Sequence, residues 1–329
     1  MRIAIEEHWA SPLNEQIRQK LTTKFNPPSY ADPELIKNQY MVRMGEEAFD
    51  TYRIPEMRSA GIDMQILSFG SPGLQGVWDP AESVKFAIEV NDKQKSITEK
   101  YPGRFEGFAA LPTADPKAAA AELRRAVTQL GCKGALVNGH TFGKYLDAPE
   151  FWGLWETAEE LGAPIYLHPY DPMFDQMKIY DDYVEMNGPT CAWNIEMCTH
   201  ATRLVVSGVF DAFPKASLII GHMGEMLPYQ LGRIDEGFRS SGGAKKNRIK
   251  NPPSYYITNN ILITTSGYWR PETMRCAIDA MGADRILFGG DYPFMLADEA
   301  VRLIEEAGLD NDTKDKIYYK NAQRVFGLV

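Results

Sequence analysis

Five side chains that can bind a metal ion follow short apolar runs spread along the whole sequence. The apolar runs are typical of β-strands, and the five residues are Glu6, His8, His168, His222 and Asp291. Glu6 and His8 stand two positions apart, so in a strand both side chains project from one face. Imidazole with carboxylate suits zinc, manganese or iron better than calcium, which prefers oxygen ligands. The pattern predicts one metal site, assembled only after folding.

Each of these residues also has a structural interpretation when it is taken alone. A single histidine at a strand end can be a hydrogen-bonded structural residue, and Asp291 can cap the Asp-Tyr-Pro turn that follows it. The two remaining histidines, His140 and His200, fall in a predicted loop and a predicted helix. The placement of three histidines and two acids at strand ends favours the metal site.

Predicted strands and helices alternate along the chain. Apolar runs predict eight strands, at residues 2–9, 64–69, 105–111, 133–139, 164–169, 217–223, 261–266 and 285–290. Helix signals lie between them, with Asp-Pro starts at Asp79 and Asp115 and glycines at the ends. The pattern predicts an α/β fold with a single domain over residues 1–329, a (β/α)8 TIM-type barrel. Catalytic groups of such barrels lie at the C-terminal strand ends, where the five candidates fall.

Composition disfavours several classes of function. The chain has 329 residues, is 44% hydrophobic and carries a net charge of -9, and its one basic run, residues 245–250, is short, so we expect no nucleic-acid partner. No apolar stretch reaches the roughly 18 residues of a membrane helix, so we expect no membrane partner. The four cysteines are scattered and no signal sequence is recognisable, which predicts a cytoplasmic protein.

Three connections are longer than usual, at residues 10 to about 50, 170 to about 195, and 234 to 258. Long loops over the C-terminal face of a barrel are typically lids or binding walls. The second connection carries Tyr170, Phe174, Tyr180, Tyr183 and Trp193. These rings could wall a flat apolar substrate or pack a subunit interface. The long loops lead us to expect a homodimer or homotetramer.

Two further acids lie beside the candidate ligands. Glu225 is three residues beyond His222, so one helical turn would bring it beside the imidazole, and we expect it to handle protons. Its alternative role is that of an acid in the first turn of a helix, favoured by the helix dipole. Glu7 points away from Glu6 in a regular strand and is expected to be structural.

Eight short segments carry a resemblance to known proteins over the whole chain. They are IEEHW (5–9), ALVNG (135–139), YLHP (166–169), GHMGE (221–225), LGRID (231–235), TTSG (264–267), ADRIL (283–287) and DYP (291–293). The chain resembles the amidohydrolase superfamily, and within it the nonoxidative decarboxylases related to aminocarboxymuconate semialdehyde decarboxylase. It is most similar to γ-resorcylate (2,6-dihydroxybenzoate) and 5-carboxyvanillate decarboxylases.

The resemblance implies roles for individual residues. One divalent ion, zinc, manganese or magnesium, would be bound by Glu6, His8, His168 and Asp291. An adjoining catalytic pair would be His222 and Glu225, and Asn138 and Arg233 would border the substrate. Arg233 would neutralise the substrate carboxylate or simply pair with Glu225 or Asp235. From the aromatic connection we expect Tyr170 and Trp193 to contact the substrate as well.

Two departures from the wider superfamily favour a mononuclear site. The first motif is Glu-x-His instead of His-x-His, and Asn138 stands where binuclear hydrolases have a bridging carboxylated lysine. His8 supports ligation like that of γ-resorcylate decarboxylases, whereas residues 139–147 look more like those of carboxyvanillate decarboxylases. The substrate assignment is therefore divided between these two groups.

The resemblance implies reversible, nonoxidative decarboxylation of an ortho-hydroxybenzoate, such as 2,6- or 2,3-dihydroxybenzoate, to a phenol and CO2, as in aromatic compound catabolism. Protonating the carboxyl-bearing ring carbon first avoids an aryl carbanion, so Asp291 would donate the proton. His222, hydrogen-bonded to Glu225, would handle the phenolic proton or orient the ring. The alternative enzyme is a metal-dependent hydrolase of a lactone or amide, in which Asp291 deprotonates metal-bound water. A barrel that has lost its chemistry is the third possibility, which the complete ligand set disfavours.

Overall fold

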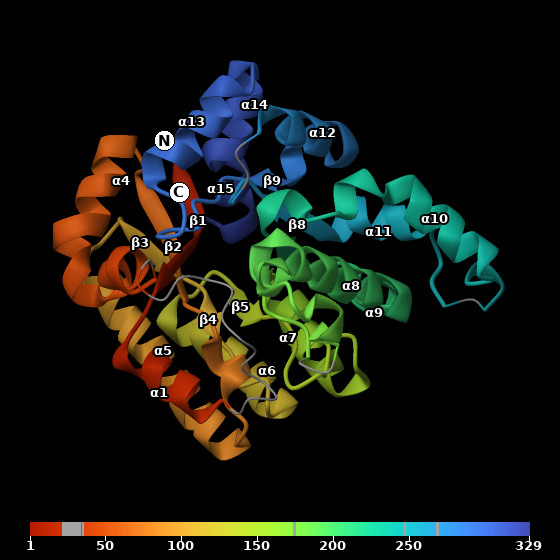
Figure 1. Ribbon diagram of the computed structural model, residues 1–329, viewed down its shortest axis with the longest axis horizontal. Helices are drawn as coiled ribbons and strands as arrows, with labels where there is room; N and C mark the ends of the chain where they lie inside the picture. Colours follow the sequence, from red (N-terminus) through yellow and green to blue (C-terminus); the bar gives the residue numbers. More distant parts are fainter. Residues whose placement is uncertain (22–33, 35, 174–175, 247, 268–269) are drawn as a thin grey trace.

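The computed structural model describes residues 1–21, 34, 36–173, 176–246, 248–267 and 270–329. Strands occupy the centre and helices surround them (Figure 1). The strand segments are β1 (Ile3–Trp9), β2 (Met64–Phe69), β3 (Phe105–Gly107), β4 (Ala109–Ala110), β5 (Ala135–Asn138), β6 (Ile165–His168), β7 (Leu218–Ile220), β8 (Ile261–Thr264) and β9 (Ile286–Leu287). Each of the eight predicted strands is present, and the third is divided into β3 and β4.

Helices cover the strands, and two of them begin directly after the predicted Asp79 and Asp115 starts. The helices are α1 (Pro12–Lys20), α3 (Val42–Met44), α4 (Ile54–Ala60), α5 (Pro80–Lys100), α6 (Pro116–Arg125), α7 (Trp152–Leu161), α8 (Ala192–Ser207), α9 (Val209–Ala212), α10 (Leu231–Ser240), α11 (Pro253–Asn260), α12 (Pro271–Met281), α13 (Ala297–Glu306), α14 (Asn311–Asp315) and α15 (Asn321–Phe326). The Asp79 carboxylate caps α5 by accepting from the backbone N–H of Glu82 (2.8 Å). Among the described helices, none is both long and apolar enough to cross a membrane.

The strands form a closed parallel ring. β1, β2 and β3 pair in that order, and β4 to β9 pair consecutively. The two sheets join at Phe108, whose N–H donates to the Leu67 carbonyl of β2 (2.8 Å), and at Ala109, whose N–H donates to Gly134 before β5 (2.9 Å). On the other side Ile5 of β1 bridges to Gly289, just after β9. The predicted barrel is therefore confirmed.

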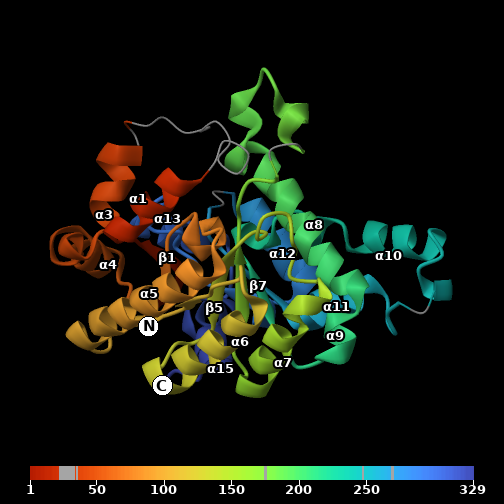
Figure 2. The ribbon, with the colours of Figure 1, turned by 90° about the horizontal axis from the view of Figure 1, so that it is seen from below.

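The interior of the barrel is packed by a layer of side chains drawn from all of its strands. These residues are Ile3, Ile5, Ile66, Phe108, Leu136, Tyr166, Ile219, Leu262 and Leu287. Ala322 and Phe326 of α15 join the same cluster. In Figure 2, α15 lies at the bottom of the barrel, opposite the helical turns that follow β6 at the top. This apolar layer is the floor of the functional site.

Polar side chains occupy the next layer, toward the C-terminal strand ends. Ser68 stands two residues after Ile66, Asn138 two after Leu136, His168 two after Tyr166, and Thr264 two after Leu262. Side chains two positions apart in a strand share a face, so the interior changes from apolar to polar within one step along four strands. All four polar residues are buried.

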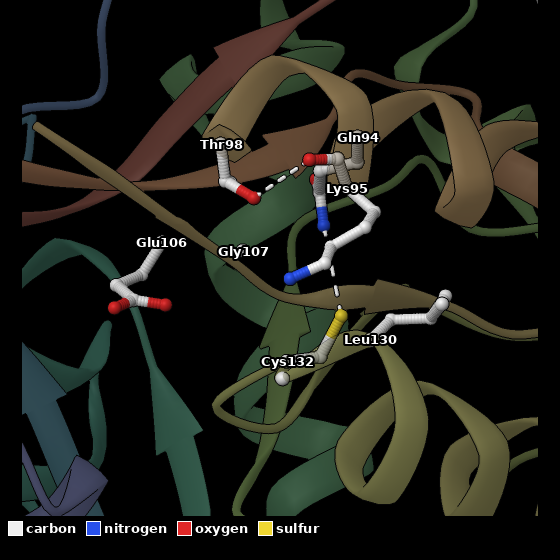
Figure 3. Close-up of a pocket in the computed structure, with 8 residues that line it drawn as sticks. Gln94, Lys95, Thr98, Glu106, Gly107, Leu130 and Cys132 are labelled. Atoms are coloured by element: carbon white, nitrogen blue, oxygen red, sulfur yellow. Dashed lines mark hydrogen bonds between the residues drawn. The ribbon is translucent and has the colours of Figure 1, made fainter. Parts of the chain in front are cut away.

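Side chains from α5 replace a missing strand partner beside β4. The Asn91 amide donates to the carbonyl of Ala110 (2.9 Å) and accepts from its N–H (2.8 Å), as a neighbouring strand would. Gln94 donates to the Phe108 carbonyl (2.9 Å) and, more weakly, to the Cys132 sulfur (3.9 Å; Figure 3). These bonds satisfy the backbone of β4, where the third strand no longer pairs with β2.

A small surface hollow lies close to this replacement. It is lined by Gln94, Lys95, Thr98, Glu106, Gly107, Leu130, Gly131 and Cys132, and Figure 3 shows the lining side chains. These residues belong to the C-terminal half of α5, to β3 and to the turn just before β5. The hollow is therefore at the end of the barrel opposite the catalytic rim, and it plays no part in the site described below.

Replacing Asn91 with leucine should destabilise the fold, because two buried backbone groups of Ala110 would lose their partners. We expect a loss of about 3 kcal/mol in the free energy of unfolding, measured by urea denaturation of the metal-free protein. An Asn259→Ala change on the exposed side of α11 is the control and should cost at most about 0.5 kcal/mol. Equal stability of the two variants would contradict the role given to Asn91.

Candidate metal centre and active site

A β-bulge in β1 directs Glu6 and His8 into the barrel. Ile5 pairs with Ile66 and Glu7 pairs with the very next residue of β2, Leu67, so Glu6 is an extra residue. Its φ of 71° is left-handed. Without the bulge, regular alternation from Ile5 would place Glu7 inside instead. The sequence predicted that Glu6 and His8 share a face, but not the irregularity that makes this face the interior one.

Four of the predicted residues converge at the C-terminal rim. Glu6, His8, His168 and Asp291 each offer one ligand atom, and these atoms lie within 4.8 Å of one another. His8 Nε2 is 3.5 Å from Asp291 Oδ1, and His168 Nε2 is 3.8 Å from Glu6 Oε1. Glu6 Oε1 and His8 Nε2 are buried without a hydrogen-bond partner among the described residues. Because buried polar atoms are normally paired, this donor set fits a divalent metal ion.

The outer atoms of the same side chains are held by hydrogen bonds. His8 Nδ1 contacts the Ser68 hydroxyl (3.0 Å), and His168 Nδ1 contacts the Pro169 carbonyl (2.9 Å). Such bonds fix the imidazoles so that Nε2 faces the cluster. Glu6 Oε2 accepts from Thr264 (3.1 Å) and, in a very short bond, from Ser266. Sequence reasoning gave no role to Ser68, Thr264 or Ser266, although the last two lie in the TTSG segment.

His222 bridges the cluster and Glu225. His222 Nε2 lies 3.6 Å from Asp291 Oδ2 and 3.8 Å from Glu6 Oε1, and Nδ1 lies 3.1 Å from Glu225 Oε1. Glu225 is therefore beside the imidazole, as expected, but a turn with left-handed residues, not a regular helix, brings it there: φ is 54° at His222, 53° at Met223 and 54° at Glu225. Strained backbone of this kind is concentrated at functional sites.

Burial and charge act against each other on the ionisable groups. Burial raises the pKa of Glu6 and, with the neighbouring His8, lowers the pKa of His168 well below its usual value. Burial also opposes the charged forms of Asp291 and His222, but contacts with neighbouring groups outweigh it. Contacts with His222 and His8 lower the pKa of Asp291. Glu6, Glu225 and Asp291 raise the pKa of His222. His222 and Asp291 thus form an ion pair.

Asn138 lies at the end of β5, Tyr170 just after β6 and Trp193 at the start of α8. The backbone N–H of Asn138 donates to the Gln75 side chain (3.0 Å), a contact that the sequence did not suggest. A Cβ on Gly139 would meet Tyr170 Cβ at 2.7 Å, so Gly139 allows this close packing. Trp193, at the start of α8, donates to Asp171 (2.6 Å). These residues can border a substrate.

Other parts of the expected aromatic wall lie elsewhere. Tyr180 packs with Met177 and Ala192 in a small core of its own loop, and Tyr183 is 63% exposed. Phe174 lies outside the described residues. The ring that does approach the cluster is Phe294, with its centroid 5.9 Å from that of His8 and 4.9 Å from that of Tyr40. No sequence signal marked Phe294 except its place directly after DYP.

Arg233 is exposed on α10, the helix that extends away from the barrel in Figures 1 and 2. Among the described residues, Glu225 contacts His222 and Asp235 accepts from Ser254 (2.8 Å). Neither expected pairing of Arg233 is therefore seen, and within this single chain the side chain is not part of the cluster.

Comparison with known proteins identifies the family. Residues 26–328 match the profile of the family described as Amidohydrolase. The chain belongs to the amidohydrolase family. It is 40% identical to the γ-resorcylate decarboxylase of Polaromonas sp. over 290 residues, which cover 84% of this chain and 86% of the relative. The family resemblance seen in the sequence is thereby confirmed.

Solved structures of amidohydrolase relatives superpose closely. The dihydroxybenzoic acid decarboxylase of Polaromonas sp., with bound manganese and the inhibitor 2-nitroresorcinol, matches with a TM-score of 0.90 and 36% identity over 99% of this chain and 97% of that one. The 5-carboxyvanillate decarboxylase of Novosphingobium aromaticivorans, with manganese and 3-methoxy-4-hydroxy-5-nitrobenzoic acid, matches with a TM-score of 0.92 and 29% identity over 100% and 97%.

The loop after β5 is fastened to α8 away from the cluster. Glu196 of α8 is 4% exposed, and the Tyr145 hydroxyl of the loop hydrogen-bonds to it. Burial raises the pKa of Glu196 from 4.5 to about 7, and Tyr145 and Arg203 reduce the shift. The native state therefore holds a proton on Glu196 that the unfolded chain releases at lower pH.

This proton predicts a pH dependence of stability. Because the pKa of Glu196 is raised in the native state, the stabilisation from its buried neutral form is complete below pH 4.5 and is lost as the pH rises to about 7. A Glu196→Gln variant should therefore become more stable than wild type between roughly pH 5 and pH 8, by up to about 3 kcal/mol in the free energy of unfolding. The difference between the two melting temperatures follows this gain. A Glu99→Gln change on the exposed side of α5 is the control. Parallel profiles of melting temperature against pH for all three proteins would refute the buried proton on Glu196.

Substituting one ligand should abolish metal binding. A His168→Ala protein loaded with Mn²⁺ and desalted should retain much less than the stoichiometric metal of wild type, because one of four donors is gone. Mass-spectrometric metal analysis measures the content. His200→Ala is a matched control, since His200 is also buried but lies away from the cluster, where it accepts from Leu146 N–H (2.9 Å) and contacts the Tyr145 ring. Full metal content in His168→Ala would exclude this ligand set.

Proposed function

We propose that this protein is a metal-dependent aromatic acid decarboxylase. It catalyses the reversible, nonoxidative decarboxylation of an ortho-hydroxybenzoate to a phenol and CO2. The observation that carries this function is the convergence of two carboxylates and two imidazoles beside the His222–Glu225 pair, in a chain that is 40% identical to a γ-resorcylate decarboxylase. Asn138, in place of a bridging lysine, supports a mononuclear site.

The proposed ligands of one divalent ion are Glu6, His8, His168 and Asp291. Their donor set suits manganese, zinc or magnesium, and manganese is present in the two solved relatives described above. When bound, the ion supplies positive charge that holds the carboxylate and ortho hydroxyl of the substrate. Glu6, His8 and His168 are buried, whereas His222 and Asp291 are partly exposed. The substrate therefore approaches from the side of His222 and Asp291.

Asp291 and His222 carry out the proton transfer in this proposal. His222 holds a proton between two carboxylates, 3.6 Å from Asp291 and 3.1 Å from Glu225, and passes it to Asp291. Asp291 donates it to the ring carbon that bears the carboxylate. The bond from this carbon to the carboxylate then breaks, its electron pair returns to the ring, and CO2 leaves. His222 recovers a proton from water, so that one proton replaces one CO2 on the ring.

The walls of the proposed substrate site are aromatic and polar. Tyr170, Trp193 and Phe294 offer ring surfaces, and Asn138 offers an amide whose Oδ1 has no partner among the described residues. A hydroxyl on the substrate ring could donate to this oxygen. We propose 2,6-dihydroxybenzoate, the substrate named by the relatives from Polaromonas sp. at 40% and from Rhizobium at 36% identity, ahead of 5-carboxyvanillate, named by a relative at 29%.

We further propose that residues 1–329 act as one domain and assemble as a homodimer or homotetramer in the cytoplasm. Pairing of β1 with the segment after β9 joins the two ends of the chain, which supports one domain. Exposed Ile179, Tyr183 and Val184 in the loop after β6 support an interface between subunits. The four cysteines are free thiols, as in a reducing compartment.

The decarboxylase function is tested by CO2 release from the manganese-loaded protein with 2,6-dihydroxybenzoate, 2,3-dihydroxybenzoate, salicylate and 5-carboxyvanillate, the phenolic product being identified by chromatography. We expect release with at least one of them. An Asp291→Asn change should lower kcat by at least about 100-fold, whereas Asp92→Asn, in an exposed ion pair with Arg125, should not.

Absence of turnover across this panel, with the metal confirmed in place, would overturn the proposal. Hydrolysis of a lactone or an amide would then be the better assignment for the same cluster.

A further inference from the structure

A buried polar network lies directly behind the metal cluster, on the outer face of β1. It consists of Glu7 in β1, Gln65 in β2 and Arg53 just before α4, and all three are 0% exposed. Arg53 Nη1 donates to Gln65 Oε1 (3.0 Å), and Gln65 Nε2 donates to Glu7 Oε2 (2.5 Å). The sequence suggested only a structural role for Glu7 and none for Arg53.

One end of this network contacts the backbone of a candidate ligand, and the other end contacts the residue beside one. Arg53 Nη2 donates in a very short bond to the carbonyl of His8. At the other end, Glu7 Oε1 accepts from the N–H of Gly290, the residue before Asp291 (2.9 Å). One chain of three side chains therefore ties the end of β1 to the turn after β9.

Aromatic rings around Arg53 add to the connection between β1 and the turn after β9. The guanidinium carbon lies 4.3 Å from the centroid of Tyr292, the residue after Asp291, and 4.6 Å from that of Phe49. The His8 N–H also donates to the Tyr292 carbonyl (2.8 Å). Burial lowers the pKa of Arg53 to about 10, so the guanidinium is still charged at neutral pH. Buried charge of this kind persists only when it is paired and hydrogen-bonded.

The segments held in this way have backbone that needs support. Glu6 and Asp291 have left-handed φ values of 71° and 55°, which non-glycine residues adopt only when their surroundings enforce it. A Cβ on Gly290 would meet Glu7 Oε1 at 2.3 Å, so Glu7 and the turn are in direct contact. The network lies where the strain is, and it touches neither the proposed substrate site nor the ligand atoms.

We propose that Arg53, acting through Gln65 and Glu7, is a positioning residue that sets the spacing between His8 and Asp291 and thereby the affinity of the site for its metal ion. This inference rests on the ligand set of the proposed function. It requires no particular substrate, because it concerns only the apposition of β1 and the turn after β9.

The test is the dissociation constant for Mn²⁺, obtained by titrating the metal-free protein and following the free ion by electron paramagnetic resonance. Arg53→Met should weaken binding by about 10- to 100-fold, as losses around metal ligands do. Arg53→Lys should fall between Arg53→Met and wild type, since an ammonium can keep the bond to His8 but lacks the planar fork that also reaches Gln65.

A matched control separates positioning from loss of stability. Asn260 is also a buried side chain that bridges backbone groups, donating to the carbonyls of Pro214 and Ala216 (3.0 Å each), but it lies before β8 at the far end of the barrel. Asn260→Leu should lower the melting temperature and leave the Mn²⁺ dissociation constant within about twofold. Wild-type affinity in Arg53→Met, or an equal loss in Asn260→Leu, would overturn the proposal.

A second variant covers the case in which Arg53→Met does not fold. Glu7→Gln keeps the shape of the side chain but has a single acceptor oxygen, so it cannot accept from both Gln65 and Gly290. It should also weaken Mn²⁺ binding, and unchanged affinity would count against the network. Because the readout is metal affinity, failure of wild type to release CO2 would refute the proposed function without bearing on this result.

Discussion

In β1 the adjacent residues Ile5 and Glu6 both face the interior of the barrel, whereas in a regular strand neighbouring side chains face opposite sides. This one-residue irregularity decides which of two adjacent glutamates enters the barrel. Glu6 joins the metal cluster, whereas Glu7 turns outward to Gln65 and Gly290. Had the strand stayed regular, His8 would also have faced the helices. The ligand set and the outer network both depend on this change of face.

The electrostatics of the rim follow from the same placement. The buried Glu6 carboxylate next to an apolar floor needs compensation, and His222 and the hydroxyls of Thr264 and Ser266 provide it. The imidazoles of His8 and His168 are held from behind, so their free nitrogens already point at one spot. Hydrogen bonds of this kind orient the imidazoles toward the cluster and thereby favour metal binding.

Much of the site could be predicted from the sequence because parallel strands bring their C-terminal ends together. The strands, the barrel and the meeting of five candidate residues at one rim follow from apolar runs that end in polar residues. The family resemblance, and not the pattern, separated the four ligands from His222. The bulge at Glu6 could not be predicted, since it depends on strand register. Arg53 was missed because its partners are 12 and 45 residues away in sequence. Tyr180 and Tyr183 have the right residue type but face their own loop and the solvent.

The proposed ligands come from distant parts of the chain, with Glu6 and His8 in the first strand and Asp291 after the last. During synthesis, His8 and His168 leave the ribosome long before Asp291, which completes the ligand set, has been made. A stable metal site can exist only once β9 has docked against β1 and the ring has closed. Metal acquisition is then a late event in the life of each molecule, and a chain that ends before residue 291 would be unable to retain the ion.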